Sequence, residues 1–79
     1  MWPADSVDKA LQVADRESHF HADVYNGWCC YGVFQINGAS HLARLRAKGL
    51  TVQDLFDPRV NIELALELFN EQGWAPWGG

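Results

Sequence analysis

The segment from Asp57 to Gln72 constrains the fold of this chain more than any other part of the sequence. Asp57 followed by Pro58 is typical of a helix start, and Gly73 is typical of a helix stop. Seven of the ten positions from Val60 to Phe69 are apolar, and Glu63, Glu67 and Asn70 form one narrow polar stripe. Because so wide an apolar surface has to be covered, we predict that this helix is the central, buried one.

Length and composition limit what can surround this helix. A chain of 79 residues has room for one hydrophobic core, so we expect a single domain over residues 1–79. The composition is that of a globular protein, with 48% hydrophobic and 20% charged residues. Four tryptophans either build the core or line a carbohydrate cleft, and composition alone does not separate these roles.

The charges exclude some partners. A formal net charge of −4 argues against nucleic acid, because a nucleic-acid binder needs clustered positive charge. The basic residues Arg44, Arg46 and Lys48 gather on one predicted helix, where we expect a solvated face. No stretch approaches the roughly 18 apolar residues of a membrane span. We therefore expect neither nucleic acid nor a membrane as a partner.

The N-terminal part of the chain predicts a helix that ends in a carboxylate. Asp5 or Ser6 is expected to cap it, and apolar residues then recur at helical spacing as far as Ala14. Three positions further, this stripe reaches Glu17, which we expect to face the interior or a cleft. Cleavage of a glycosidic bond needs a carboxylic acid that stays protonated near neutral pH, and apolar surroundings favour that form. Glu17 is therefore a candidate catalytic acid, the alternative being an ordinary exposed side chain at a frayed helix end.

The rest of the chain is predicted to be less regular. Residues 21–37 lack helical periodicity and contain the turn signal Asn26-Gly27, which favours an extended segment or a short hairpin. A second helix is expected over residues 39–48 and a short helical turn over residues 51–56. Residues 74–77 are expected to fold back onto the core. The predicted fold is thus mainly α, with a short β-hairpin or extended loop.

No second carboxylate forms a convincing pair with Glu17. Asp15 lies roughly 200° around the helix from Glu17, so it points away. Asp23 could reach the same cleft, but a turn residue bonded to nearby backbone amides is the favoured interpretation. A mechanism with one carboxylate is therefore favoured.

Asn61 is a polar residue on the apolar side of the last helix. It lies roughly 160° from Glu63 around the helix axis, and so faces the core. Because a buried amide needs hydrogen-bond partners, Asn61 is either a structural residue or the floor of an active site.

Histidines and cysteines do not make a recognisable reactive site. His19, His21 and His41 do not combine with Cys29 and Cys30 at any familiar zinc spacing, so no metal or other cofactor is expected. A Cys/His nucleophilic pair lacks a residue that would orient the histidine. A disulfide between neighbouring cysteines needs a strained ring, so we expect two free, partly buried thiols.

Several segments together resemble the soluble lytic transglycosylases and goose-type lysozymes. In that family a Glu-Ser pair ends a helix, a Gly and a Gln follow fifteen and eighteen residues after the Glu, and an Asn-Ile pair opens a long buried helix. Gly32 and Gln35 stand at those offsets from Glu17. The matching segments are Glu17-Ser18-His19-Phe20, residues 31–36 and Asn61-Ile62. Residues 73–77 are similar to the C-terminal end of small actinobacterial and phage members, including resuscitation-promoting-factor-like domains. The resemblance implies an α+β lysozyme-like fold.

The same resemblance implies an activity. Glu17 would protonate the oxygen between MurNAc and GlcNAc in peptidoglycan. It would then take the proton of the MurNAc C6 hydroxyl, which closes to a 1,6-anhydro ring.

The resemblance also implies roles for the other site residues. Gln35 would hydrogen-bond the sugar or hold the Glu17 side chain. Asn26 stands at the position where many members carry a Ser or Asn beside the catalytic Glu. Tyr31 and Gly32 would line the cleft, and Asn61 would support the acid from beneath.

Other outcomes stay open. The loop over residues 27–30 departs from the small polar residues usual in the family, and the chain is short. These features motivate a non-catalytic wall-binding or phage structural module as the alternative, and the same acid could also serve plain hydrolysis. We expect the protein to act at the bacterial cell wall. The sequence shows no signal peptide, which fits an enzyme delivered by a phage or a fragment of a secreted protein. It is expected to act as a monomer or as part of a larger protein.

Overall fold

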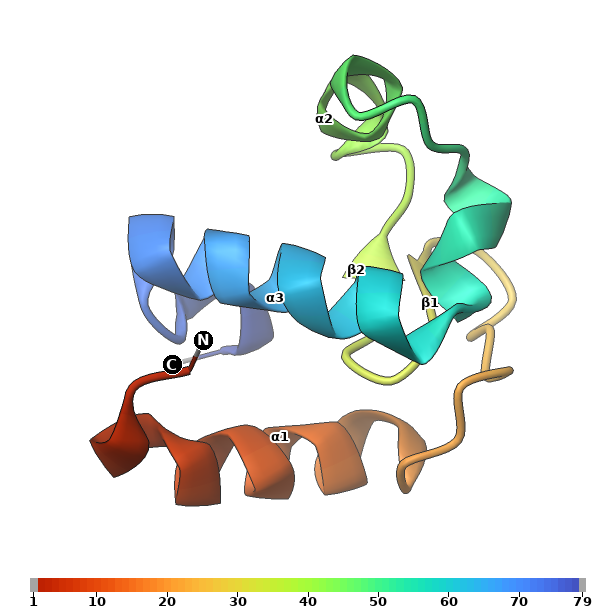
Figure 1. Ribbon diagram of the computed structural model, residues 1–79. Coiled ribbons are helices and arrows are strands. Elements are labelled where there is room, and N and C mark those ends of the chain that lie inside the picture. Colours follow the sequence, from red (N-terminus) through yellow and green to blue (C-terminus); the bar gives the residue numbers. More distant parts are fainter. Residues whose placement is uncertain (1, 79) are drawn as a thin grey trace.

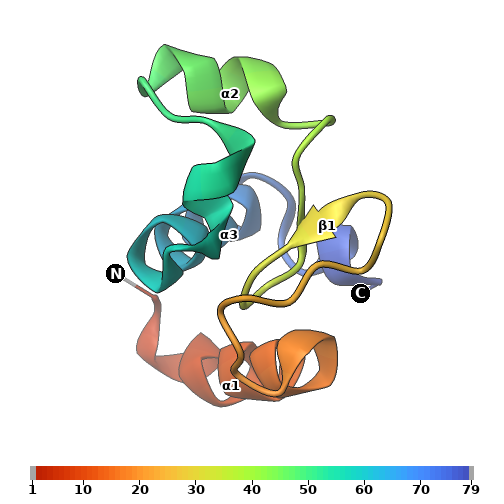
Figure 2. The same cartoon turned by 90° about the vertical axis from the view of Figure 1, so that its right-hand side faces the viewer.

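The computed structural model describes residues 2–78. Its elements are a 3-10 turn η1 (Ala4–Ser6), helix α1 (Val7–Ser18), strands β1 (Cys30–Tyr31) and β2 (Ile36–Asn37), helix α2 (Leu42–Ala47), 3-10 helix η2 (Val52–Phe56), helix α3 (Pro58–Gln72) and 3-10 turn η3 (Ala75–Trp77). Helix α3 lies in the middle, with α1 running along one side and α2 crossing the other side at a steep angle (Figure 1). The small hairpin packs beside α3, between the other two helices (Figure 2). The mainly helical fold with a short hairpin is therefore confirmed.

Helix α3 begins and ends as its sequence predicts. The Asp57 carboxylate accepts a hydrogen bond from the Arg59 backbone N–H at 2.9 Å, and Gly73 ends the helix with a φ of 62°. Its core-facing side carries Asn61, Leu64, Ala65 and Leu68, all almost fully buried.

Helix α3 is central, as predicted, but part of its apolar surface is left uncovered. Ile62 is 36% exposed, and with residues of the first helix it borders an open apolar groove of about 170 Å³. The exposed side chains in this groove are Val7, Leu11, Phe20 and Ile62. No helix within residues 2–78 is long and apolar enough to cross a membrane.

Helix α1 starts where expected, but without the predicted cap. Ser6 precedes the helix, yet its side chain makes no capping hydrogen bond. The reason is the preceding 3-10 turn, which contains Asp5 and in which the Ser6 N–H bonds to the Pro3 carbonyl at 2.9 Å. The helix ends because His19 and Phe20 take positive φ angles of 54° and 64°.

The hairpin is antiparallel and closes through residues 32–35. Cys30 pairs with Asn37, and Tyr31 pairs with Ile36. Gly32 has a φ of 77°, and a Cβ there would collide with the Leu55 carbonyl and the Asn61 side chain. Only glycine fits this position, both by conformation and by space.

The second helix is shorter than predicted. Residues 39–41 form turns, so α2 covers only Leu42–Ala47, although Gly49 follows it with the expected positive φ of 74°. The predicted turn over residues 51–56 is confirmed as η2, in which Thr51 and Asp54 form a reciprocal capping box.

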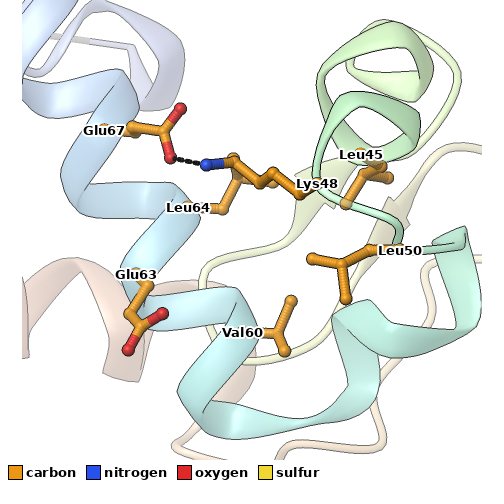
Figure 3. A pocket seen from close by; sticks show the side chains of 7 residues that line it. All are labelled: Leu45, Lys48, Leu50, Val60, Glu63, Leu64 and Glu67. Atoms are coloured by element: carbon orange, nitrogen blue, oxygen red, sulfur yellow. Dashed lines mark ion pairs between the residues drawn. The ribbon is translucent and has the colours of Figure 1, made fainter.

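Arg44 of α2 and Lys48 directly after it pair across to α3, so the expectation of a merely solvated face is wrong for these two residues and holds only for the exposed Arg46. Arg44 donates to Glu67 at 2.8 Å and to Glu71 at 2.7 Å. Lys48 pairs with Glu67 at 2.6 Å, over a small apolar hollow of about 60 Å³ between the two helices (Figure 3). These ion pairs fix α2 against α3.

Three of the four tryptophans build the core. Trp2 stacks on Phe34 at 5.6 Å and on Trp74 at 5.8 Å, so the two ends of the described chain lie side by side. Trp77 is 9% exposed, which confirms that the C-terminal segment folds back. Trp28, in contrast, is 79% exposed on the loop before β1.

The Asn61 amide is expected to be essential for stability. Asn61→Ala removes three hydrogen bonds to main-chain groups, two of them buried, so the free energy of unfolding should fall by about 3 kcal/mol. Urea denaturation measures this change. The control Asn70→Ala, at an exposed position of the same helix, should change the free energy by less than about 0.5 kcal/mol. Equal stability of both variants would contradict the prediction.

The ion pairs between α2 and α3 predict a pH dependence of stability. The Lys48 hydrogen bond is the main cause that lowers the pKa of Glu67 below its ordinary 4.5, and the Arg44 hydrogen bond is the main cause that lowers the pKa of Glu71. Because both folded pKa values are lowered, the stabilisation is complete above the unfolded value and is lost as the pH falls below it. Arg44→Ala should therefore be less stable than the wild type near neutral pH, and the two urea midpoints should converge in acid. A difference between the two urea midpoints that stays constant with pH, or no difference near neutral pH, would contradict the prediction. The control Arg46→Ala should have the wild-type midpoint throughout.

Candidate functional site

Glu17 occupies the last turn of α1. Its side chain is 27% exposed, and its Oε2 accepts a hydrogen bond from Arg16 Nε at 3.2 Å. Within residues 2–78, its Oε1 has no hydrogen-bond partner. The expected apolar surroundings are thus only partly present, because a guanidinium lies against one oxygen.

Ser18 attaches the end of α1 to the hairpin turn. Its side chain is 5% exposed, and its Oγ is 2.8 Å from the Val33 carbonyl and 3.1 Å from the Ala14 carbonyl. The residue beside the candidate acid is thus fixed to residues 32–35. This contact brings Glu17 and the turn that carries Gln35 into one region.

Gln35 has a committed amide nitrogen and an available amide oxygen. Nε2 donates to the Gly32 carbonyl at 2.9 Å and to the Val24 carbonyl at 3.0 Å. Its backbone has a φ of 51°, and its N–H bonds to the Gly32 carbonyl at 3.1 Å. No hydrogen bond within residues 2–78 joins Gln35 to Glu17. The side chain therefore closes its own turn, and its Oε1 has no hydrogen-bond partner within residues 2–78.

Asn61 is completely buried and uses its whole amide within the protein. Oδ1 accepts from the Phe34 N–H at 2.8 Å, while Nδ2 donates to the Tyr31 carbonyl at 2.8 Å and the Leu55 carbonyl at 2.9 Å. It is therefore a support of the hairpin turn and does not contact a ligand directly.

Asn26 shapes the loop before β1. Its Oδ1 accepts from the N–H groups of Trp28, Cys29 and Cys30 at 3.2, 3.0 and 3.1 Å, and its Nδ2 lies 3.2 Å from Cys29 Sγ. The amide is thus occupied by the loop.

Cys29 and Cys30 form a disulfide with each other, so the prediction of two free thiols is wrong. The prediction considered only the strain of the ring between neighbours. In the folded chain, the tight loop that Asn26 organises brings both side chains to the same side. Cys29 is buried, and Cys30 continues into β1.

Tyr31 points toward aromatic neighbours. Its ring stacks on Tyr25 at 4.7 Å and meets Phe56 edge-on at 5.4 Å. Of the two residues of β1, Cys30 lines the nearby cavity and Tyr31 does not. Gly32 is buried beneath the turn.

A cavity of about 170 Å³ lies between the hairpin and the C-terminal turn. Gln35 is the predicted site residue that lines it. Asn37 and His41 add polar groups, and Trp77 forms part of the opposite wall. The full lining is Cys30, Gln35, Ile36, Asn37, His41, Leu68, Pro76 and Trp77. Planar polar side chains beside an aromatic ring suit the hydroxyl groups and apolar faces of a sugar.

Glu17 is connected to this cavity through its neighbour. Arg16 Nη2 donates to the Trp77 carbonyl at 2.7 Å, while Nε contacts Glu17. The Arg16 guanidinium therefore bridges the Glu17 carboxylate and Trp77, a residue of the cavity wall.

His41 adds a neutral group to the cavity. Burial lowers its pKa below 6.5, the positive charge of Arg44 lowers it further, and Glu71 opposes both. At neutral pH the imidazole is therefore an uncharged donor and acceptor.

The remaining candidates do not assemble into a site. Asp23 is exposed and makes no hydrogen bond within residues 2–78, so its predicted turn-stabilising role is wrong. Asp15 points to His19 at 3.2 Å, away from Glu17 as expected. No cluster of three or more metal-binding side chains occurs among residues 2–78.

Sequence reasoning missed four residues of this region: Arg16, Asn37, His41 and Trp77. His41 was weighed as a metal ligand or as part of a Cys/His pair, and Trp77 was left open, with the other tryptophans, between the core and a carbohydrate cleft. The position of Asn37, two residues after Gln35, was a usable signal, because alternate strand residues point to the same side.

The sequence profile of one family, described as "Transglycosylase SLT domain", matches residues 4–73. The matched range includes all six predicted site residues. No curated protein and no solved structure matches the chain significantly.

The disulfide between the two cysteines is directly testable. Unfolded protein treated with iodoacetamide without reductant should carry no adduct, and after reduction with dithiothreitol it should carry one on each cysteine. Mass spectrometry of the peptide that spans the loop measures this. The control Cys30→Ser should expose one reactive thiol, at Cys29. Alkylation of the unreduced wild type would show that the bond is not formed.

Proposed function

Since this chain belongs to the transglycosylase SLT domain family, which implies peptidoglycan lytic transglycosylase activity, we propose that it cleaves the β-1,4 bond between MurNAc and GlcNAc with Glu17 as its catalytic acid. Residues 1–79 act in this proposal as one catalytic domain at the bacterial cell wall. The observation that carries it is the attachment of the Glu17 helix end to the turn of Gln35, through the hydrogen bond between Ser18 and Val33.

The proposed reaction needs one carboxyl group. Glu17 donates its proton to the bridging oxygen while the bond from that oxygen to C1 of MurNAc breaks. The C6 hydroxyl oxygen then bonds to C1, and its proton passes to the Glu17 carboxylate. Attack within the same sugar replaces an activated water by a high effective concentration, so a second carboxylate is not needed. Asp15 pairs with His19 and Asp23 is exposed, and neither contacts Glu17 through a hydrogen bond or ion pair within residues 2–78, which supports such a mechanism.

The other residues bind and support in this proposal. The free Oε1 of Gln35 accepts from a sugar hydroxyl, since its nitrogen is already bonded to the main chain. Asn26 shapes the loop before β1, and Tyr31 with Gly32 belongs to the hairpin that Asn61 supports, so these residues act on the cleft only through the position of that hairpin. Asn61 acts from beneath by holding the turn. Asn37 and His41 extend the polar lining toward further sugar units.

Replacing the proposed acid tests the function. Glu17→Gln should reduce the release of soluble muropeptides from purified cell walls by at least about 100-fold, because it removes the proton donor. Its circular dichroism and thermal midpoint should remain those of the wild type. Glu63→Gln, at an exposed carboxylate of α3, makes the same change of charge and should leave the activity unchanged. Wall clearance by Glu17→Gln at the wild-type rate would refute the assignment.

Mass spectrometry of the products separates the remaining alternatives in the same assay. Transglycosylation gives 1,6-anhydro-MurNAc ends, which are one water lighter than the products of hydrolysis. A wild-type protein that sediments with insoluble peptidoglycan but releases no fragment would instead be a non-catalytic wall-binding module.

A further inference from the structure

Arg16 contacts Glu17 in a way that helix geometry alone does not produce. Consecutive residues of an α-helix point about 100° apart, and ion pairs along a helix normally join residues three or four positions apart. Arg16 nevertheless donates from Nε to its immediate neighbour Glu17 at 3.2 Å. The same guanidinium is also bonded outside the helix, because its Nη2 donates to the Trp77 carbonyl at 2.7 Å.

The Trp77 carbonyl is a fixed anchor for this guanidinium. The Trp77 ring is 9% exposed, its Nε1 donates to the Phe34 carbonyl at 2.9 Å, and it packs edge-on against Phe34 and Trp74. A charge-assisted hydrogen bond to such an acceptor limits the movement of the guanidinium. Arg16 therefore holds Glu17 relative to the C-terminal turn, which the Trp77 ring bonds in its turn to Phe34, next to the Val33 carbonyl that holds Ser18.

The two oxygens of the Glu17 carboxylate are consequently unequal. Arg16 binds Oε2, whereas Oε1 has no hydrogen-bond partner among residues 2–78. Trp77, which holds the guanidinium, also lines the cavity with Gln35. We propose that Arg16 is a positioning residue that fixes the Glu17 carboxylate by Oε2 against the C-terminal turn, so that Oε1 delivers and receives the proton. This inference rests on the proposed function.

The size of the interaction indicates what its loss would change. The Arg16 side chain is 58% exposed, and exposed ion pairs contribute little to stability. A displacement of a reacting group by about 1 Å, however, can cost about 100-fold in rate. Removal of Arg16 should therefore lower the rate of the chemical step and leave the fold intact.

The experiment compares Arg16→Ala, Arg16→Lys and wild type on a soluble, peptide-free strand of alternating GlcNAc and MurNAc. Arg16→Ala should lower kcat by about 10- to 100-fold and leave KM within about 2-fold. Arg16→Lys should recover only part of kcat, because an ammonium group lacks the planar fork that spans both acceptors. Free guanidinium ion should raise the kcat of Arg16→Ala but not that of Glu17→Gln. The control Arg46→Ala, at an exposed arginine of α2, should keep the wild-type kcat.

Three results would overturn the inference. An unchanged kcat for Arg16→Ala removes the positioning role, and a raised KM at constant kcat makes Arg16 a substrate-binding residue instead. A kcat that stays low at every guanidinium concentration indicates a purely structural defect, which a free ion does not repair. The proposed function would fail by a different result, which is full activity of Glu17→Gln. If Glu17→Gln is inactive and Arg16→Ala is fully active, only the role of Arg16 is rejected.

Discussion

The buried side-chain amide of Asn61 is the interaction on which the rest of the structure depends. It holds the hairpin turn by hydrogen bonds to Tyr31 and Phe34, and it holds η2 through the Leu55 carbonyl. Gly32 permits this close approach, since any side chain there would collide with the amide. A fully satisfied polar network in a core specifies one arrangement, because a partial arrangement leaves buried groups unpaired. Helix α3 thereby determines the position of the turn.

The elements that carry the candidate site are attached to that same turn. Ser18 connects the end of α1 to Val33, and Trp77 connects the C-terminal turn to Phe34. Glu17 is thus positioned by contacts with residues far away in sequence, although its own helix is short. In a chain of 79 residues, a few well-placed hydrogen bonds replace the larger packing surface of a longer domain.

Periodicity and end signals predicted much of the fold and part of the site. The apolar spacing in residues 57–72 gave the central helix, and its angle from Glu63 placed Asn61 on the core side. The bonding partners of Asn61 could not be predicted, because they are main-chain groups up to 30 residues away that no side-chain pattern marks. The family spacing from Glu17 indicated Gln35 as a site residue. Which atom of its side-chain amide is left without a partner depends on the hydrogen bonds of the folded turn, which the spacing does not contain.

The errors have a common physical cause. The disulfide of Cys29 and Cys30 depends on the loop that Asn26 organises. The ion pairs of Arg44 depend on the position of α3, which carries their carboxylates. The exposed side of Ile62 depends on how many elements surround α3. A sequence pattern describes one element at a time, whereas these features arise only between elements.

The open apolar groove beside α1 has a consequence for how heat would inactivate the protein. The core positions of α1 are small, with Ala10, Val13 and Ala14 buried, whereas α3 buries Leu64 and Leu68. Detaching α1 therefore gives up less apolar contact than melting the centre of the molecule, so local opening at α1 costs less free energy than global unfolding. Because the proposed acid Glu17 lies in the last turn of α1, the proposed activity would be lost on warming while the α3 core is still folded. Loss of turnover would then report a partial opening of the molecule, ahead of its denaturation.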